Sequence, residues 1–69
     1  MKTIDLHGFK YVEAKRELEL FINDNWGFRI KVITGNSESM KNVVCEVIRE
    51  YKLEFTRDPM DAFIIIKEH

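Results

Sequence analysis

Residues 29–51 read RIKVITGNSESMKNVVCEVIREY and predict a strand, a turn and a helix in succession. Charged and apolar residues alternate over the first five positions, which is typical of a strand with one buried face. Thr, Gly, Asn and Ser at positions 34–37 are turn-forming residues. Six apolar side chains, beginning at Met40, then recur at the three- and four-residue steps of one buried helix face. We expect Ser37 or Ser39 to cap this helix, because a short hydroxyl accepts hydrogen bonds from the amides of a first turn.

The flanking segments continue the alternation of strands and helices. Apolar residues spaced by two, then by three and four, then by two again indicate each change of element. In chain order we first expect a strand ending at Gly8 and a helix from about Lys10 to Asn23-Asp24-Asn25, with Gly27 as its left-handed stop. A strand at 29–33 and the second helix follow. The chain then continues with a strand at 53–55, a turn at 57–61 built on Pro59 and aspartate, and a strand at 62–67.

This order predicts the architecture. Two right-handed strand–helix–strand crossovers in one direction place both helices on the same face of a sheet. We therefore expect an α/β (α+β) two-layer sandwich, β-α-β-α-β-β in order, with a four-stranded mixed sheet and one open face. The 69 residues suffice for one domain, residues 1–69, because a second domain would need a core of its own.

Composition excludes several classes of protein. Eleven basic and twelve acidic side chains give a formal charge of −1, so a nucleic-acid site would have to be a local basic patch. A single cysteine, Cys45, excludes an internal disulfide, and we expect it to be inert packing. The longest apolar run, Phe63–Ile66, is too short for a membrane span or a signal sequence. We expect a soluble, cytoplasmic protein without a membrane partner, and a disordered terminal His69.

Alternation also assigns side chains to the two faces of the sheet. If the apolar residues of the first two strands point to the helices, an acid, an imidazole and two cations share the open face or its rim. These residues are Asp5, His7, Arg29 and Lys31. The run Phe63–Ile66 is apolar on both faces, which predicts a central strand shielded by long side chains or a self-association surface. A homodimer through this strand is left open.

Two motifs resemble those of a known family. Ile4-Asp5-Leu6-His7-Gly8 resembles the signature that opens the small MutS-related (Smr) domain, namely Leu or Ile, Asp, Leu, His and Gly at the end of the first strand. The family's second signature follows its second strand and reads His-Gly or Thr-Gly, any residue, then Gly. Thr34-Gly35-Asn36 is similar to the threonine form, with Ser37 in place of the second glycine. Spacing and element order agree over essentially the whole chain.

The resemblance implies a fold similar to the C-terminal domain of bacterial translation initiation factor three. It also implies endonuclease activity, either nicking DNA or cleaving RNA, sometimes on ribosome-bound message. The implied roles fall on Asp5 and His7 from the first motif, and on Thr34, Gly35 and Asn36 from the second.

The residue types agree with this chemistry on physical grounds. Cleavage of a phosphodiester needs a base for the attacking oxygen and positive charge near the non-bridging oxygens. An imidazole such as that of His7 exchanges protons near neutral pH, and a carboxylate such as Asp5 can orient it or hold a divalent cation. Residues 34–37 precede a helix, whose free amides and dipole favour a phosphate, and Gly35 allows close backbone approach.

We therefore expect a small endonuclease that cleaves or nicks RNA or structured DNA, with His7 as general base or acid. Asp5 would orient His7 or bind a metal; whether Mg²⁺ or Mn²⁺ takes part is left open. The expected phosphate- or nucleic-acid-binding residues are Gly8, Arg29, Lys31, Thr34, Gly35, Asn36 and Ser37.

Each motif also has a purely structural interpretation. Asp5 can cap backbone amides, His7 can hold a loop carbonyl at a strand end, and residues 34–37 can form an ordinary capped turn. Phe9 and Trp26 can cover the ends of a small core or stack on bases. Two other functions fit the pattern: a non-catalytic nucleic-acid- or ribosome-binding module on the same fold, and a protein-interaction domain that uses the apolar last strand.

Overall fold

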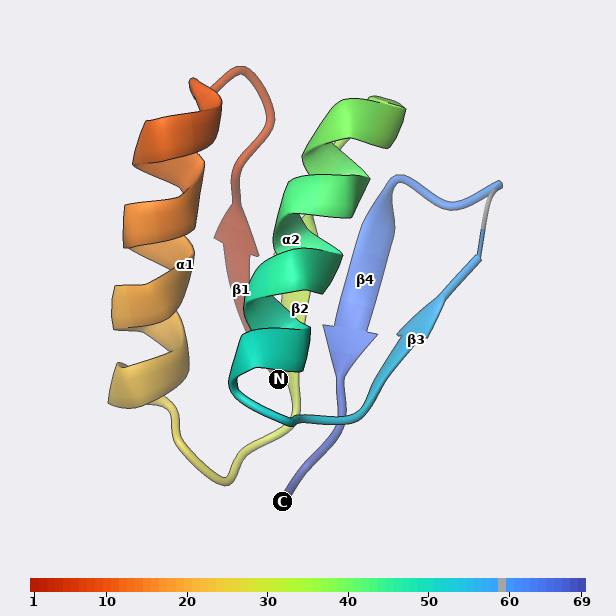
Figure 1. Cartoon of the computed structure of the whole chain (residues 1–69). Coiled ribbons are helices and arrows are strands. Elements are labelled where there is room, and N and C mark those ends of the chain that lie inside the picture. Colours follow the sequence, from red (N-terminus) through yellow and green to blue (C-terminus); the bar gives the residue numbers. More distant parts are fainter. Residues whose placement is uncertain (59) are drawn as a thin grey trace.

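The sheet places four short strands in the order β1-β2-β4-β3, with both helices against one of its faces (Figure 1). This computed structural model describes residues 1–58 and 60–69. The elements are β1 (Lys2–Asp5), α1 (Tyr11–Asp24), β2 (Ile30–Ile33), α2 (Glu38–Glu50), β3 (Phe55–Arg57) and β4 (Phe63–Ile66).

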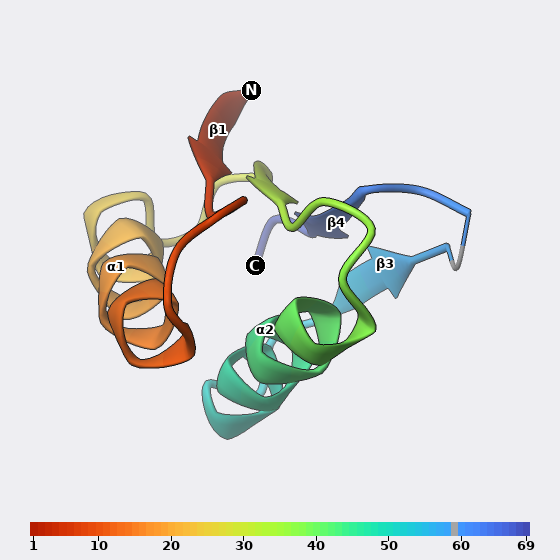
Figure 2. The same cartoon turned by 90° about the horizontal axis from the view of Figure 1, so that it is seen from above.

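The sheet is mixed, as the element order predicts. Strand β1 runs parallel to β2, whereas β4 runs antiparallel to both of its neighbours, β2 and β3. Seen from above, the two helices lie on the same side and the other face of the sheet is uncovered (Figure 2). The α+β two-layer architecture with one open face is therefore confirmed.

Alternation along the strands places the apolar side chains as expected. Leu6, Ile30 and Val32 point into the core, each with at most 1% of its surface exposed. Helix α2 contributes one continuous face to the same core, made of Met40, Val44, Cys45, Val47 and Ile48. Strand β4 is a central strand: Ile64 and Ile66 are buried against the helices, while Phe63 and Ile65 lie on the other face.

The helix ends follow local chemistry. Ser37 caps α2, with its Oγ accepting a hydrogen bond from the Met40 amide at 3.1 Å. Asn25 ends α1, and its side-chain amide donates to the Phe21 carbonyl at 2.9 Å. Gly27 then adopts a φ of +90°, which confirms the expected left-handed stop.

Strand β3 begins two residues later than the sequence pattern indicates. Helix α2 ends with Lys52 in the left-handed conformation, at φ +58°, and the Leu53 amide donates back to the Ile48 carbonyl at 3.2 Å. This six-to-one hydrogen bond is the usual way to satisfy the last carbonyls of a helix. Leu53 therefore belongs to the helix end, and the expected strand at 53–55 is wrong in its bounds.

Arg57, expected in the turn, is the last residue of β3. Its guanidinium pairs with the Glu38 carboxylate and donates to the Asn42 side chain at 3.2 Å, which ties β3 to α2. The following turn closes on Asp58, whose carboxylate accepts from the Met60 amide at 2.9 Å. Pro59, the other residue of that expected turn, lies outside the described residues.

The C-terminal residue is placed against the fold rather than disordered. The His69 ring lies edge-on to Trp26, with 4.5 Å between the ring centroids. The Gly27 amide donates to His69 Nε2 at 3.1 Å. Trp26 and His69 thus pack against each other at one end of the molecule, where Trp26 remains 52% exposed. Within the described part of the chain, neither helix is long and apolar enough to span a lipid bilayer.

Replacing Ser37 by Ala should destabilise the fold by about 1 kcal/mol, because the Met40 amide would lose its capping partner. Urea unfolding followed by circular dichroism measures this loss. Ser39→Ala is the matched control, since Ser39 is exposed within the first turn and is not the cap. Equal losses for the two variants would contradict the assignment of Ser37 as the cap.

Candidate functional site

The two sequence motifs meet at one edge of the sheet. Strands β1 and β2 are parallel neighbours, with Asp5 opposite Ile33, so their carboxyl ends lie side by side. Both helices begin at this same edge (Figure 1). The first amides of each helix have no carbonyl one turn earlier to donate to, and they carry the positive end of the helix dipole. Two such ends therefore face the segments that follow β1 and β2.

A hollow of about 340 Å³ lies between these segments. It receives residues from the end of β1, the start of α1, the turn after β2 and the start of α2. Its lining consists of His7, Gly8, Phe9, Tyr11, Thr34, Asn36, Ser37 and Met40. Open α/β sheets commonly bind ligands at the carboxyl ends of their strands, as here.

The His7 imidazole rests on Gly35. Gly35 has a φ of +70°, and a Cβ added there would lie 2.8 Å from the Cδ2 of His7. Any larger residue would therefore displace the ring. Within residues 1–58 and 60–69 the hydrogen bonds include none from either ring nitrogen of His7, so the ring holds no loop carbonyl there. Both nitrogens are left available to exchange a proton with a ligand.

Thr34 anchors the turn instead of facing the hollow with its hydroxyl. The residue is 2% exposed, and its amide and that of Gly35 both donate to the Ala62 carbonyl, at 2.9 and 3.0 Å. The Thr34 hydroxyl lies 2.9 Å from the Gly35 carbonyl oxygen and 3.2 Å from that of Ala62. These acceptors engage the Thr34 donor within the protein, which differs from the expectation that it donates to a phosphate.

The remaining turn residues stay accessible. Asn36 and Ser37 are exposed at the hollow, and the Ser37 hydroxyl accepts from Met40 while keeping its own proton to donate. Gly8 has a φ of +84° with no atom within 4 Å of an added Cβ, so it shapes the loop without crowding it. Polar donors at the hollow therefore come from Asn36, Ser37 and the first amides of α2.

Asp5 contacts the backbone of His7. Its Oδ1 accepts a hydrogen bond from the His7 amide at 2.9 Å, so the carboxylate fixes the chain that carries the imidazole. This is the capping role expected from the structural interpretation of Asp5. Among the described residues no group of three or more His, Cys, Asp and Glu side chains is arranged to hold a metal ion. A divalent cation at this edge would take Asp5 as one ligand and the rest from substrate or water.

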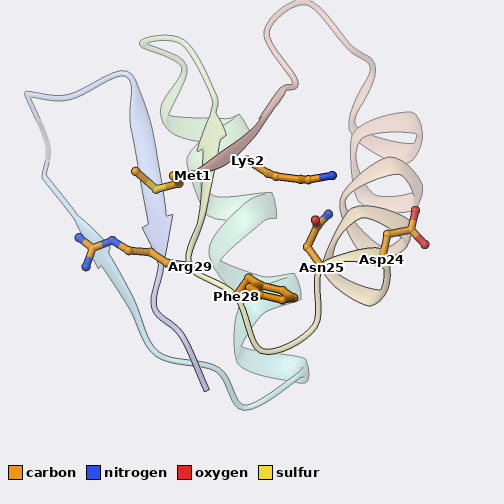
Figure 3. A pocket seen from close by; sticks show the side chains of 6 residues that line it. All are labelled: Met1, Lys2, Asp24, Asn25, Phe28 and Arg29. Carbon is orange, nitrogen blue, oxygen red and sulfur yellow. The ribbon is translucent and has the colours of Figure 1, made fainter.

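The structure does not bring the two cations expected at the site, Lys31 on β2 and Arg29 just before it, to the hollow. Lys31 lies on the open face, with its Nζ 4.2 Å from the centre of the Phe63 ring. Arg29 precedes β2 and lies five residues from Thr34, or about 16 Å at the rise of an extended strand. Arg29 lines a larger hollow of about 580 Å³ at the opposite end of the sheet, with Met1, Lys2, Asp24, Asn25 and Phe28 (Figure 3).

Phe9, for which the sequence left both core cover and base stacking open, lies in the lining of the hollow and is 42% exposed. The sequence pattern did not indicate two other features of the site. Tyr11 and Met40 line the hollow although their spacing marks them as helix-face residues. Ala62, which holds the turn through its carbonyl, carries no side-chain signal at all.

Comparisons with models of protein families, with curated proteins and with solved structures gave no significant match to this chain. The functional assignment therefore depends on the two motifs and on the geometry of the edge that they share.

Gly35→Ala should destabilise the protein more than Gly8→Ala, and should move the His7 ring. Both variants incur the left-handed backbone penalty of about 1–2 kcal/mol. Gly35→Ala adds the overlap with His7, for which we expect about 1 kcal/mol more. Urea unfolding gives both losses, and the imidazole proton resonances report the ring. Equal losses with an unmoved His7 resonance would contradict the contact.

Proposed function

We propose that this chain is a small Smr-type endonuclease that cleaves RNA at the edge where β1 and β2 end, with structured DNA as the alternative substrate. The observation that carries the proposal is the position of the His7 imidazole. It rests on Gly35, in the same hollow as Asn36 and Ser37 at the start of α2. A proton-exchanging group and an anion-binding helix end therefore lie at one accessible place.

The motifs support the family assignment. Ile4–Gly8 supplies Asp5 and His7, and Thr34–Asn36 supplies the turn on which the imidazole rests. The β-α-β-α-β-β order over the whole chain agrees with the fold that the resemblance implies, which is similar to the C-terminal domain of translation initiation factor three.

The chemistry begins with binding of a phosphate. The first amides of α2, the Ser37 hydroxyl and the Asn36 side chain offer hydrogen bonds to non-bridging oxygens. Glu38 stands in the first turn of α2, but its carboxylate is paired with Arg57 on the β3 side. That pairing reduces its repulsion of an anion. The positive end of α1 adds to the field at the same hollow.

His7 would then transfer the proton that cleavage requires. In RNA the nucleophile is the 2′-hydroxyl next to the scissile phosphate, and the neutral imidazole accepts its proton. The 2′-oxygen attacks phosphorus and the bond from phosphorus to the 5′-oxygen breaks. The products are a cyclic phosphate and a 5′-hydroxyl, whose proton returns from the imidazolium or from water. One base suffices for this route, which favours RNA.

Asp5 is a positioning residue in this proposal. Its bond to the His7 amide holds the strand end that carries the imidazole. With DNA as substrate a water must be activated instead, and Asp5 is then the candidate ligand for Mg²⁺ or Mn²⁺.

A second candidate function is a nucleic-acid- or ribosome-binding module without catalysis. The hydrogen bond of Asp5 favours it, because the carboxylate contacts the backbone rather than the imidazole. The absence of Arg29 and Lys31 from the hollow favours it as well, since no cation from β2 stands beside the scissile phosphate. Binding without cleavage would select this function.

His7→Ala should lower the rate of RNA cleavage by at least about 100-fold, because proton transfer to a positioned side chain contributes that much. Asp5→Ala should lower it by about tenfold through loss of the bond to the His7 amide. Cleavage is measured on labelled single- and double-stranded RNA and DNA, with and without Mg²⁺ or Mn²⁺.

His69→Ala is the matched control, because His69 lies against Trp26, away from the hollow, and should cleave at the wild-type rate. Circular dichroism checks that each variant is folded. Wild-type protein that binds but cuts none of these substrates would contradict the nuclease and select the binding module. Equal loss in the His7 and His69 variants would contradict the role of His7.

A further inference from the structure

The open face of the sheet carries a mixed aromatic and basic surface. The register places Lys31 beside Ile65, and Ile65 beside Thr56 on β3. The next row toward the hollow pairs Ile33 with Phe63. No helix covers this side (Figure 2), and Phe63 is half-buried among its neighbours on the sheet. The surface leads toward the edge where His7 lies.

The cations on and beside β2 are available to an anionic ligand. Among the described residues no ion pair involves Arg29 or Lys31, so neither cation is neutralised by a carboxylate in direct contact. Lys31 instead places its ammonium 4.2 Å from the centre of the Phe63 ring. Lys31 and Phe63 are both half-buried on a face that solvent reaches, where a cation–π contact is weak enough for a ligand to displace it.

The opposite end of β2 adds an exposed aromatic ring and more positive charge. Phe28 is 69% exposed beside the larger hollow. In Figure 3 the Lys2 side chain extends toward Asn25 and Asp24, whereas Arg29 extends in the direction of β4. One exposed aromatic ring, Phe28, and two cations, Arg29 and Lys31, therefore lie between residue 28 and the middle of β2.

We infer that this face is a platform for a single strand of nucleic acid, which runs along β2 and delivers its phosphodiester to the His7 hollow. The inference rests on the proposed function, because it names the form of substrate that the same site would receive. A base stacks on Phe63 and displaces the Lys31 ammonium, which then contacts a phosphate. Arg29 and the Phe28 ring engage the strand further from the site.

The chemistry of the face favours a single strand over a duplex. From Arg29 to Gly35 the backbone spans about 20 Å, enough for at most about six stacked nucleotides. Stacking on an aromatic side chain needs an unpaired base whose face is free, and a duplex keeps these faces inside its own stack. A second copy of the chain fits less well, because a two-fold pairing of this face would bring the uncompensated cations of both copies together.

Fluorescence anisotropy with a labelled oligodeoxythymidylate of about ten nucleotides tests the platform, against a hairpin duplex of the same length. This probe has no 2′-hydroxyl, so the proposed attack cannot consume it. We expect tighter binding of the single strand. Phe63→Leu should weaken that binding by about 5- to 150-fold, the range of one stacked base.

Lys31→Gln should weaken binding and reduce the slope of log affinity against log salt by about 0.7, the value for one phosphate contact on a single strand. It also provides a second test if Phe63→Leu fails to fold, which circular dichroism reveals. Lys15→Gln is the matched control, because Lys15 is an exposed cation on α1 and should leave affinity unchanged.

Equal affinity for the duplex would overturn the inference, as would unchanged affinity in both the Phe63 and Lys31 variants. Sedimentation showing a wild-type dimer that Phe63→Leu dissociates, with no change in nucleic-acid affinity, would assign the face to a second copy instead. The proposed function fails separately: normal platform binding without cleavage contradicts the nuclease and supports the platform. Cleavage by the wild type, with unaltered affinity in both variants, would support the nuclease and contradict the platform.

Discussion

The Ala62 carbonyl at the start of β4 accepts hydrogen bonds from the amides of both Thr34 and Gly35, at 2.9 and 3.0 Å, and joins the end of β2 to the neighbouring strand. This clamp fixes the turn that leads into α2 and holds Gly35 at a φ of +70°. Because Gly35 has no side chain, the His7 imidazole occupies the space where a Cβ would lie. The two motifs therefore meet because the Ala62 carbonyl fixes the turn and because Gly35 lacks a Cβ.

Most of the fold follows from patterns that are local in the sequence. The periodicity from Met40 onward predicts α2, and a hydroxyl at its start predicts the Ser37 cap, because both depend on neighbours within one turn. The start of β3 was not predictable in this way. Lys52 takes the left-handed conformation usually left to glycine or asparagine, so nothing in its residue type marks the helix end. His69 was likewise missed, since its contact with Trp26 joins distant parts of the chain.

The sequence likewise predicts the location of the candidate site better than the roles of its residues. Adjacent parallel strands bring His7 and residues 34–37 to one edge. The sequence indicated that each motif lies at the end of a strand, and the pairing of these two strands comes from the structure. The roles of the individual side chains at this edge depend on tertiary contacts that residue types do not specify. Thr34 turns its hydroxyl to the Ala62 carbonyl, and Asp5 reaches the His7 amide instead of its ring. Arg29 precedes β2 and lines the hollow at the opposite end of the sheet, too far away to join His7.

The proposal on which the others depend is the binding of a nucleic-acid phosphate at the start of α2, beside His7. Nuclear magnetic resonance of isotope-labelled protein, titrated with a short single-stranded oligodeoxynucleotide, tests it most directly because no cleavage is required. We expect the amides of residues 35–39 and the His7 imidazole to shift together and to saturate at one common affinity. Binding that leaves these resonances in place while others move, or no binding at all, would contradict it.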